Sequence, residues 1–315
     1  MLSARSFYGV FKPEYFFRPQ QIIHKFYREL SGRKQEIKVA DLPWGLKLNV
    51  DTGESIGWSI YTRALYETPI VEALWRLTHP GDLVVDGGAN IGYMTSVLAI
   101  RVGKTGRVLS FEPHPEIFSQ LKRNVALWAQ DGVADRVELF QTALGDTEGI
   151  ACLRIPTFFS TNAGTSWIEH NASESNAESI KVPVTTLDKV IGTGQTVGVV
   201  KLDVEGFELS VLKGMKNLLA SQRVRYIIFE EFNSFPAPTH KFLSGLGYFV
   251  YGIEHSFGGI HFLRDQEPSS DPISGPPQNY LATLEPPDVL SRIAVGLWRS
   301  FGPLSHLMGD NRNSS

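Results

Sequence analysis

Cysteine, long apolar runs and an excess of one sign of charge are all scarce in this chain of 315 residues. Cys152 is its single cysteine, so no disulfide can form within the chain and nothing indicates an oxidising compartment. Its 30 basic and 33 acidic residues leave a formal charge of −3, which gives no electrostatic argument for binding nucleic acid. No run of about 18 uncharged apolar residues occurs, so we expect no transmembrane helix.

The N-terminal segment lacks the long apolar centre of a signal peptide, because Arg5, Lys12 and Pro13 interrupt it. We therefore expect a cytoplasmic protein. The segment is aromatic and basic, which leaves peripheral contact with a membrane surface open. The alternative is a helix that packs on its own domain. With 42% hydrophobic residues, the chain has enough apolar material for a globular core.

The patterns divide the chain into three parts. Residues 1–68 are expected to form an accessory region, with a helix at residues 20–30 and a β-hairpin at residues 36–51 around a Pro-Trp-Gly turn. Residues 69–299 are expected to form one α/β domain. Residues 300–315 are polar and are expected to form a flexible tail.

Strand and helix patterns alternate from residue 82 onward, which favours parallel βαβ units covered by helices on both faces. Two strands are also expected near the C-terminal end, and a single helix is expected at residues 208–221. Residues 157–179 are polar and have no clear period, so we expect a loop there. The predicted buried strands lie at residues 82–88, 106–113, 136–146, 197–206 and 224–232.

Acidic residues stand at the ends of four of these strands. Ligands of open parallel sheets bind at the carboxyl ends of the strands, so these acids are expected to line a site. They are Asp86, Glu112, Asp203 with Glu205, and Glu230 with Glu231.

The loop after the first of these strands, with Gly88 and Gly92, predicts a close approach between backbone and ligand. A carboxylate at Asp86 would repel a pyrophosphate and attract a cationic ligand, which favours S-adenosylmethionine over NAD. Glu112 follows Gly92 by 20 residues, the distance at which an acid commonly meets ribose hydroxyls. The loop still fits a degraded dinucleotide fingerprint with Ala89 in the middle position, so NAD stays the alternative.

Five segments resemble the FkbM-type methyltransferases in order and spacing, over about residues 80–250. They are VVDGGANIGYMTSVLA, LSFEPHPEIFSQLKRNV, TALGDTEG, VPVTTLDKV and VKLDVEGFELSVLKGM. The resemblance implies an α/β class I fold, with a mostly parallel seven-stranded sheet whose last strand is antiparallel. It also implies methyl transfer from S-adenosyl-L-methionine, usually to an oxygen.

The same resemblance assigns cofactor-binding residues. It places Asp86, Gly88, Asn90 and Gly92 around the methionine part of the cofactor. It places Glu112 on the ribose and the segment with Asp146 near the adenine.

Asp203 and Glu205 are the candidate catalytic residues, because a hydroxyl acceptor must lose its proton to a nearby base. Glu205 is the first choice as base, with helix capping as its structural alternative. Asp203 either acts on the acceptor side or holds the ammonium group of the cofactor. Lys201 is expected to pair with one of these acids, and Glu208 is expected to be a first-turn helix acid.

Two histidines and a metal are weaker candidates. His114 is expected near the cofactor pocket, and His240 faces either solvent or the site. Asp203, Glu205 and Glu230 offer oxygen ligands suited to Mg²⁺, but no close-set metal signature is present, so we expect no metal.

The sequence thus favours an O-methyltransferase that acts on a small molecule, a sugar or a glycolipid-type acceptor. Two alternatives stay open at this point. One is an NAD-dependent oxidoreductase, and the other is a non-catalytic binding protein on a methyltransferase fold.

Overall fold

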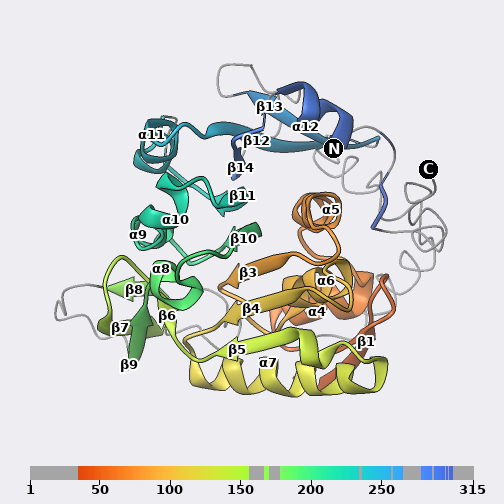
Figure 1. Cartoon of the computed structure of the whole chain (residues 1–315). Coiled ribbons are helices and arrows are strands. Elements are labelled where there is room, and N and C mark those ends of the chain that lie inside the picture. Colours follow the sequence, from red (N-terminus) through yellow and green to blue (C-terminus); the bar gives the residue numbers. More distant parts are fainter. Residues whose placement is uncertain are drawn as a thin grey trace, which may run out of the picture.

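A twisted sheet of eight strands organises the protein (Figure 1). The computed structural model describes residues 35–155, 167–169, 178–233, 236–256, 258–264, 278–285, 287–294, 296 and 298–300. In spatial order the strands are β13 (Gly259–Arg264), β12 (Phe249–Ser256), β14 (Asn279–Thr283), β11 (Val224–Glu230), β10 (Val197–Leu202), β3 (Leu83–Gly87), β4 (Arg107–Phe111) and β5 (Val137–Phe140).

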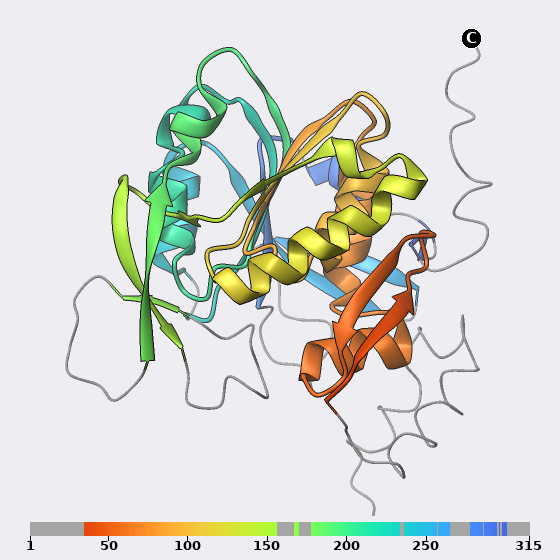
Figure 2. The ribbon, with the colours of Figure 1, turned by 90° about the horizontal axis from the view of Figure 1, so that it is seen from below.

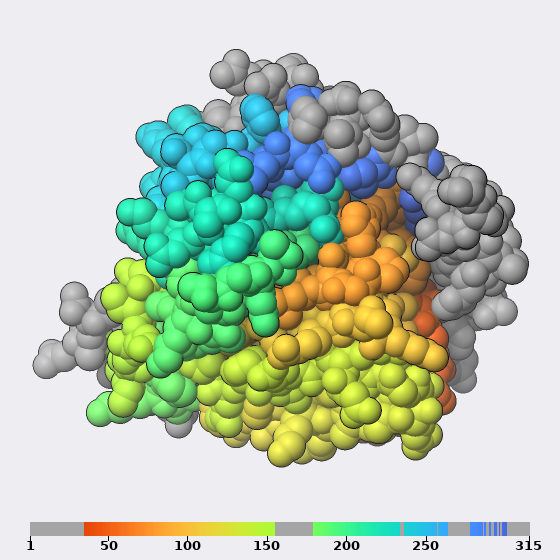
Figure 3. Space-filling model, in the orientation of Figure 1, coloured from red at the N-terminus to blue at the C-terminus, as the bar shows by residue number. Residues whose placement is uncertain are grey.

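The directions of the strands confirm the predicted class I sheet. Strands β5, β4, β3, β10 and β11 are parallel, and β14 runs antiparallel between β11 and β12. Strand β13 adds an eighth strand at the edge, antiparallel to β12, which the sequence did not predict. On the molecular surface the same order appears as bands of colour, with α7 and β5 at the lower end and β11 and β12 toward the upper end (Figure 3).

Helices cover both faces of the sheet because successive strand residues point to opposite sides. Val84 belongs to the core beneath one layer, and its neighbour Val85 belongs to the core beneath the other. One layer contains α5 (Thr68–Leu77), α6 (Tyr93–Arg101) and α7 (Pro115–Leu127). The opposite layer contains α8 (Leu187–Ile191), α9 (Glu208–Lys213), α10 (Lys216–Ala220) and α11 (Pro238–Gly245) (Figure 1).

The predicted N-terminal hairpin is present and packs against the α7 side of the molecule (Figure 2). It consists of β1 (Ile37–Asp41) and β2 (Lys47–Asp51), and α4 (Ser55–Arg63) follows it. The Trp44 indole N–H donates to the Ser96 hydroxyl of α6 at 3.0 Å, and Trp44 is buried. Two 3₁₀ turns, Trp128–Asp131 and Ala134–Arg136, lead from α7 to β5. The predicted helix at residues 20–30 lies outside the described residues.

A second, smaller sheet corrects the prediction of one strand at residues 136–146. The strand of the main sheet stops at Phe140, and β6 (Ala143–Leu144) pairs with β9 (Glu178–Thr185) instead. The small sheet is completed by β7 (Gly149–Ile155) and β8 (Trp167–Glu169). Parts of the loop expected at residues 157–179 therefore belong to β8 and β9, and the rest lies outside the described residues. The sequence pattern did not predict these strands, because β7 and β9 contain exposed residues and β9 also contains Pro183.

The single helix expected at residues 208–221 is two helices in the structure. Helix α9 ends at Lys213 and α10 starts at Lys216. A Cβ on Gly214 would lie 1.9 Å from the carbonyl oxygen of Gly145, so the backbone must approach that loop closely. Among the described residues, no helix has the length and apolar character needed to cross a bilayer.

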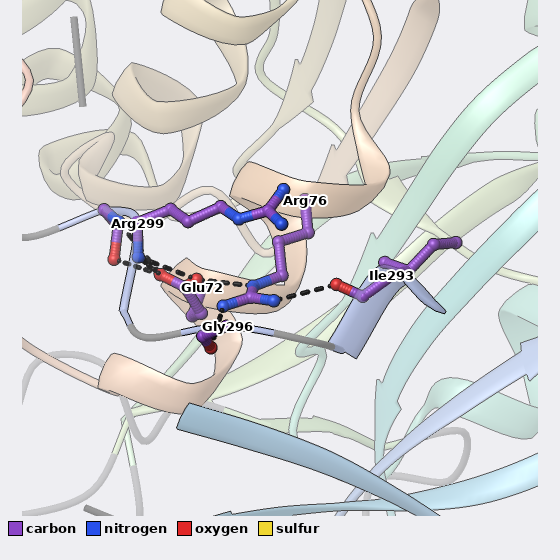
Figure 4. Close-up of polar contacts among 6 residues, drawn as sticks. Glu72, Arg76, Ile293, Gly296 and Arg299 are labelled. Carbon is purple, nitrogen blue, oxygen red and sulfur yellow. Dashed lines mark hydrogen bonds and ion pairs between the residues drawn. The ribbon is translucent and has the colours of Figure 1, made fainter. Parts of the chain in front are cut away.

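A buried ion pair fastens the C-terminal part of the described chain to α5 (Figure 4). The carboxylate of Glu72 binds the guanidinium of Arg76 at 2.5 Å, and both side chains are fully buried. Glu72 also accepts hydrogen bonds from the backbone N–H groups of Arg299 and Ser300. Arg76 donates to the carbonyl of Ile293, the last residue but one of α12 (Pro287–Ala294). We call this arrangement the Glu72 clamp.

Candidate functional site

Two neighbouring cavities open at the carboxyl ends of the parallel strands, where the sequence predicted a site. We name each after one of its acids. The Glu112 cavity is lined by Gly88, Asn90, Phe111, Glu112, Pro113, Ile117, Thr142, Ala143, Leu144, Leu153, Asp203, Val204 and Glu205. The Glu230 cavity is lined by Ser55, Ile56, Ser59, Tyr66, Glu67, Gly88, Ala89, Asn90, Ile91, Tyr93, Met94, Lys201, Asp203, Glu205, Glu230 and Phe232.

The loop after β3 belongs to both cavities, because Gly88 and Asn90 line each of them. Gly88 has φ +73°, and a Cβ there would lie 1.8 Å from the carbonyl oxygen of Asp203. Only glycine can therefore bring this loop against the end of β10. Asn90 also has a positive φ of 49°, and its side-chain oxygen accepts a hydrogen bond from the N–H of Ile91. Gly88 thus serves a close approach to the end of β10, and the predicted close approach of this loop to a ligand stays a prediction.

Glu112 directly follows β4, as predicted for a strand-end acid, and its contact with a ribose stays a prediction. One carboxylate oxygen accepts from the N–H of Asn90 at 3.0 Å and the other accepts from the N–H of His114 at 2.9 Å. The residue is 6% exposed and lines the cavity that bears its name. Burial raises the pKa of Glu112 to about 7, against the two backbone hydrogen bonds that lower it. Each carboxylate oxygen keeps a second lone pair that can accept a hydrogen bond from a hydroxyl group of a ligand.

Asp86 lies behind the cavity wall. It is fully buried, its carboxylate accepts from the Thr95 hydroxyl at 2.6 Å, and it is not among the residues that line either cavity. The ammonium of Lys201 lies 3.4 Å from Asp86 and 3.3 Å from Asp203. Burial raises the pKa of Asp86, and Lys201 and Thr95 oppose that shift. Asp86 therefore positions Lys201, and its predicted contact with a cofactor stays a prediction.

Lys201 is the link between the strand ends, which confirms the predicted pairing. Besides the two carboxylates, its ammonium donates to the carbonyl oxygen of Gly88 at 3.0 Å. Burial by itself lowers the pKa of Lys201, but the carboxylates of Asp203, Asp86 and Glu67 together raise that pKa above its ordinary value. The side chain is therefore a permanent cation whose partners are all supplied by the protein.

Gly92 and Asp146 do not reach the cavities. Gly92 is the N-cap residue before α6 and has φ +96°. A Cβ there would lie 2.8 Å from the Leu121 side chain, so glycine is needed at this position for helix packing. Asp146 is exposed, and its N–H donates to the Ser210 hydroxyl. Thr142, Ala143 and Leu144, just before it, line the Glu112 cavity instead. Cofactor contacts of Gly92 and Asp146 stay predictions.

Glu205 and Asp203 lie where the two cavities meet, since both line both of them. Glu205 adopts φ 52°, a left-handed conformation that costs a non-glycine residue about 1–3 kcal/mol. Burial, followed by the charges of Asp203 and Glu208, raises the pKa of Glu205 to about 7. A carboxyl group with that pKa is suited to take a proton near neutral pH.

Glu208, rather than Glu205, organises the turn before α9. Its carboxylate accepts from the N–H groups of Val204 and Gly206 at 3.1 and 3.4 Å. This confirms Glu208 as a first-turn helix acid. The N-cap residue of α9, Phe207, makes no side-chain cap hydrogen bond, and helix capping by Glu205 stays the alternative to its role as base.

Glu67 is a residue of this site that the sequence analysis missed. It precedes α5, lines the Glu230 cavity and has φ 45°. Burial, followed by the charge of Asp203, raises the pKa of Glu67. The only signal in the sequence is an acid before a helix that starts with Thr-Pro, and acids at that position are common for reasons of helix stability alone.

Glu230 and Glu231, adjacent at the end of β11, have different roles. Glu230 lines the cavity, and burial followed by the charges of Asp203 and Glu67 raises its pKa to about 8. The carboxylate of Glu231 instead accepts from the Thr239 hydroxyl at 2.5 Å and from the side-chain amide of Asn233 at 2.7 Å. Glu231 therefore supports the end of the strand and does not face a ligand.

The two histidines lie outside the cavity linings. His114 precedes α7 and is 3% exposed, and burial lowers its pKa. His240 lies in α11 between the rings of Phe229 and Tyr280, so it belongs to the core and not to solvent. Over the described part of the chain, no group of three or more His, Cys, Asp or Glu side chains is arranged to hold a metal ion.

Comparison with known proteins gives a family. Residues 86–250 match the family model described as "Methyltransferase FkbM domain". The hexuronic acid methyltransferase AglP of Haloferax volcanii is 30% identical over 166 residues, which cover 52% of this chain and 62% of AglP. Methyltransferase 1 of Beauveria bassiana is 28% identical, over 42% of this chain and 57% of that protein. This chain thus spans less than two thirds of these curated relatives.

Solved structures with a similar chain trace are distant in sequence. The crystal structure of methyltransferase FkbM from Methylobacillus flagellatus is 17% identical with a TM-score of 0.42, and the match covers 71% of this chain and 52% of that one.

Proposed function

Because the FkbM family model matches more than half of its residues, the chain belongs to the FkbM methyltransferases, and we propose that it methylates a hydroxyl oxygen. Its cofactor is S-adenosylmethionine. The proposed acceptor is a small molecule, a sugar or a glycolipid-type compound. The name of AglP supports a sugar, because that relative is a hexuronic acid methyltransferase.

The Glu112 cavity fits this cofactor by the chemistry of its lining. The buried carboxylate of Glu112 keeps free lone pairs for the two ribose hydroxyls. Apolar side chains of Phe111, Ile117 and Leu144 offer a dry surface to an aromatic base. The carboxylates of Asp203 and Glu205 favour a cationic group at the junction of the cavities, and no phosphate has to be accommodated there.

One observation carries the proposal: two cavities meet at Gly88, Asn90, Asp203 and Glu205. A donor in one cavity and an acceptor in the other would face each other across this junction, which is the alignment that methyl transfer needs. The cofactor, when bound, supplies a methyl group that its sulfonium has already activated.

Glu205 is the proposed base. When bound, S-adenosylmethionine would supply the methyl group to the acceptor oxygen, and the Glu205 carboxylate would take the proton that the hydroxyl loses. Asp203 cannot take this role freely, because it is paired with the protonated Lys201. Asp203 therefore holds the junction in shape and offers its remaining oxygen to a cationic group.

The test is a methyl-transfer assay on the full chain with S-adenosylmethionine and a panel of hydroxylated acceptors. We expect release of S-adenosylhomocysteine that depends on the acceptor, and a product whose new methyl group is on oxygen by NMR. Glu205→Gln should lower the rate by about a hundredfold or more while S-adenosylhomocysteine still binds. A product methylated on nitrogen or carbon would contradict the proposal, and so would an unchanged rate in the variant.

A further inference from the structure

The Glu230 cavity is unusually rich in carboxylates for a site that would receive an acidic sugar. Glu67, Asp203, Glu205 and Glu230 all line it, and they come from three separate parts of the chain: the start of α5, the turn after β10 and the end of β11. Repulsion between these groups contributes to the raised pKa values of Glu205 and Glu230. The cavity therefore already resists the addition of negative charge.

The described lining offers no cation to an acidic ligand. Lys201 is the one basic residue in that lining, and its three N–H donors face Asp86, Asp203 and the carbonyl of Gly88. Arg63 of α4 is not in the lining, and its guanidinium donates to the hydroxyl of Ser59, which is. An anionic acceptor would thus meet four carboxylates without a countercharge of its own.

Aromatic rings provide a second, independent feature of the same cavity. Phe232 lines it and is 62% exposed, which is uncommon for a phenylalanine in a folded chain. Tyr66 and Tyr93 line it too, and their rings meet edge to face with centroids 6.2 Å apart. Rings of this kind can pack on the apolar C–H face of a sugar, while carboxylates accept hydrogen bonds from its hydroxyls.

Resting on the function proposed above, we propose that the Glu230 cavity takes an uncharged glycoside and excludes glycosides that carry a carboxylate. Glu67 and Glu230 are the specificity-determining residues. They accept hydrogen bonds from sugar hydroxyls and repel an anionic group, whose charge would be only weakly screened in a partly buried site. This acceptor differs from the hexuronic acid that names the archaeal relative.

Part of the lining that makes this choice lies outside the matched family segment, whereas Glu230 lies within it. Ser55, Ser59, Tyr66 and Glu67 all precede residue 86, where the family match begins. The cofactor cavity, by contrast, is built entirely from residues within residues 86–250. A different acceptor preference on a shared cofactor site is therefore structurally accessible.

The experiment compares matched glycosides by saturation-transfer NMR, with the full chain loaded with S-adenosylhomocysteine at pH 8.5. The probes are the methyl β-glycosides of glucose, galactose and mannose, each paired with its uronate. We expect at least one neutral glycoside to bind, with a dissociation constant at least tenfold lower than that of its uronate. In the variant Glu67→Gln/Glu230→Gln, which preserves side-chain shape, this ratio should fall at least threefold.

A matched control separates local recognition from the overall charge of the protein. The variant Glu138→Gln/Glu148→Gln also removes two negative charges, but from exposed ion pairs with Arg107 and Lys189. It should leave the ratio of the dissociation constants unchanged. Equal or tighter binding of the uronates would overturn the inference. So would an unchanged ratio in the first variant, or failure of every neutral glycoside to bind. Calorimetric binding of S-adenosylhomocysteine, measured on the same sample, distinguishes these results from a failure of the proposed function.

Discussion

At the scale of single residues, the site combines buried acids with backbone conformations that these side chains rarely adopt. Glu67, Asn90 and Glu205 all have positive φ angles and all line the Glu230 cavity. Such conformations cost about 1–3 kcal/mol each and persist where the surrounding structure imposes them. Their concentration at one cavity supports the proposed acceptor site.

The raised pKa of Glu205 leads to a pH dependence. As the proposed base, Glu205 is active only when ionised, so kcat should rise tenfold per pH unit below about 7 and level off above it. At pH 5 the rate should be roughly a hundredfold below the plateau. A pH–rate profile measures this. Glu67→Gln should move the rising limb to lower pH, because the charge of Glu67 contributes to the raised pKa of Glu205.

Two results would argue against this assignment. A flat profile between pH 5 and 7 would show that no group with the pKa of Glu205 controls the rate. A limb that persists unchanged in Glu205→Gln would assign the proton transfer to another residue.

Sequence patterns identified some of these residues and not others, for a physical reason. Glu112 and Glu205 follow buried apolar strands, so their positions at the sheet edge could be predicted. Asp86 follows the same rule, but its partners Thr95 and Lys201 turn it into a buried support. The place of Glu67 in the site depends on where α5 packs relative to β10, and no local sequence pattern encodes this packing.

At the scale of elements, the Glu72 clamp connects α5 with the chain that follows α12 (Figure 4). Helix α5 begins directly after Glu67, so this helix joins the clamp to the wall of the Glu230 cavity. In the clamp, the buried Glu72 carboxylate accepts hydrogen bonds from the backbone N–H groups of Arg299 and Ser300. Such charge-assisted hydrogen bonds are stronger than neutral ones.

Removing the carboxylate should destabilise the protein strongly. Glu72→Ala leaves the buried Arg76 without its countercharge, and we expect the free energy of unfolding to fall by about 3–5 kcal/mol. Denaturant unfolding of the full chain measures this. Glu138→Ala is the control, because the Arg107–Glu138 pair is half exposed and should cost less than about 1 kcal/mol. Equal effects of the two substitutions would mean that the clamp contributes no more than a surface pair.

The elements differ in how far the sequence predicted them. Strands β3, β4, β10 and β11 are largely apolar because both faces of the sheet are covered, so they were predictable. Strand β13 pairs only with β12 at the sheet edge, and β7 and β9 form a thin sheet with little core. Their residues carry weaker periodic signals, and they were missed.

At the scale of the whole molecule, the accessory region and the family domain share one core. Trp44, Leu46 and Leu48 of the hairpin are buried in the same apolar cluster as Val97 of α6 and Leu121 of α7. Asn124 of α7 also exchanges hydrogen bonds with the backbone of Asn49 in β2. The boundary predicted between residues 68 and 69 therefore separates two parts of the chain that pack against each other in the fold.

That packing predicts the behaviour of a shortened chain. A chain that begins at residue 69 should lack a cooperative thermal transition, because it exposes the surface that Trp44 covers. Trp44→Ala in the full chain should lower the free energy of unfolding by about 3–5 kcal/mol. Circular dichroism during heating measures both. A shortened chain that unfolds cooperatively near the temperature of the full chain would show that residues 69–299 are an independent domain.

The most direct test of the account is calorimetric titration of S-adenosylhomocysteine into the full chain and into two variants. Glu112→Ala removes the carboxylate that we propose binds the ribose, so we expect the affinity of this variant to fall at least tenfold. Glu116→Ala, at an exposed position in the first turn of α7, should bind like the unaltered chain. Equal affinity of all three proteins, or no binding by the unaltered chain, would contradict a cofactor site in the Glu112 cavity.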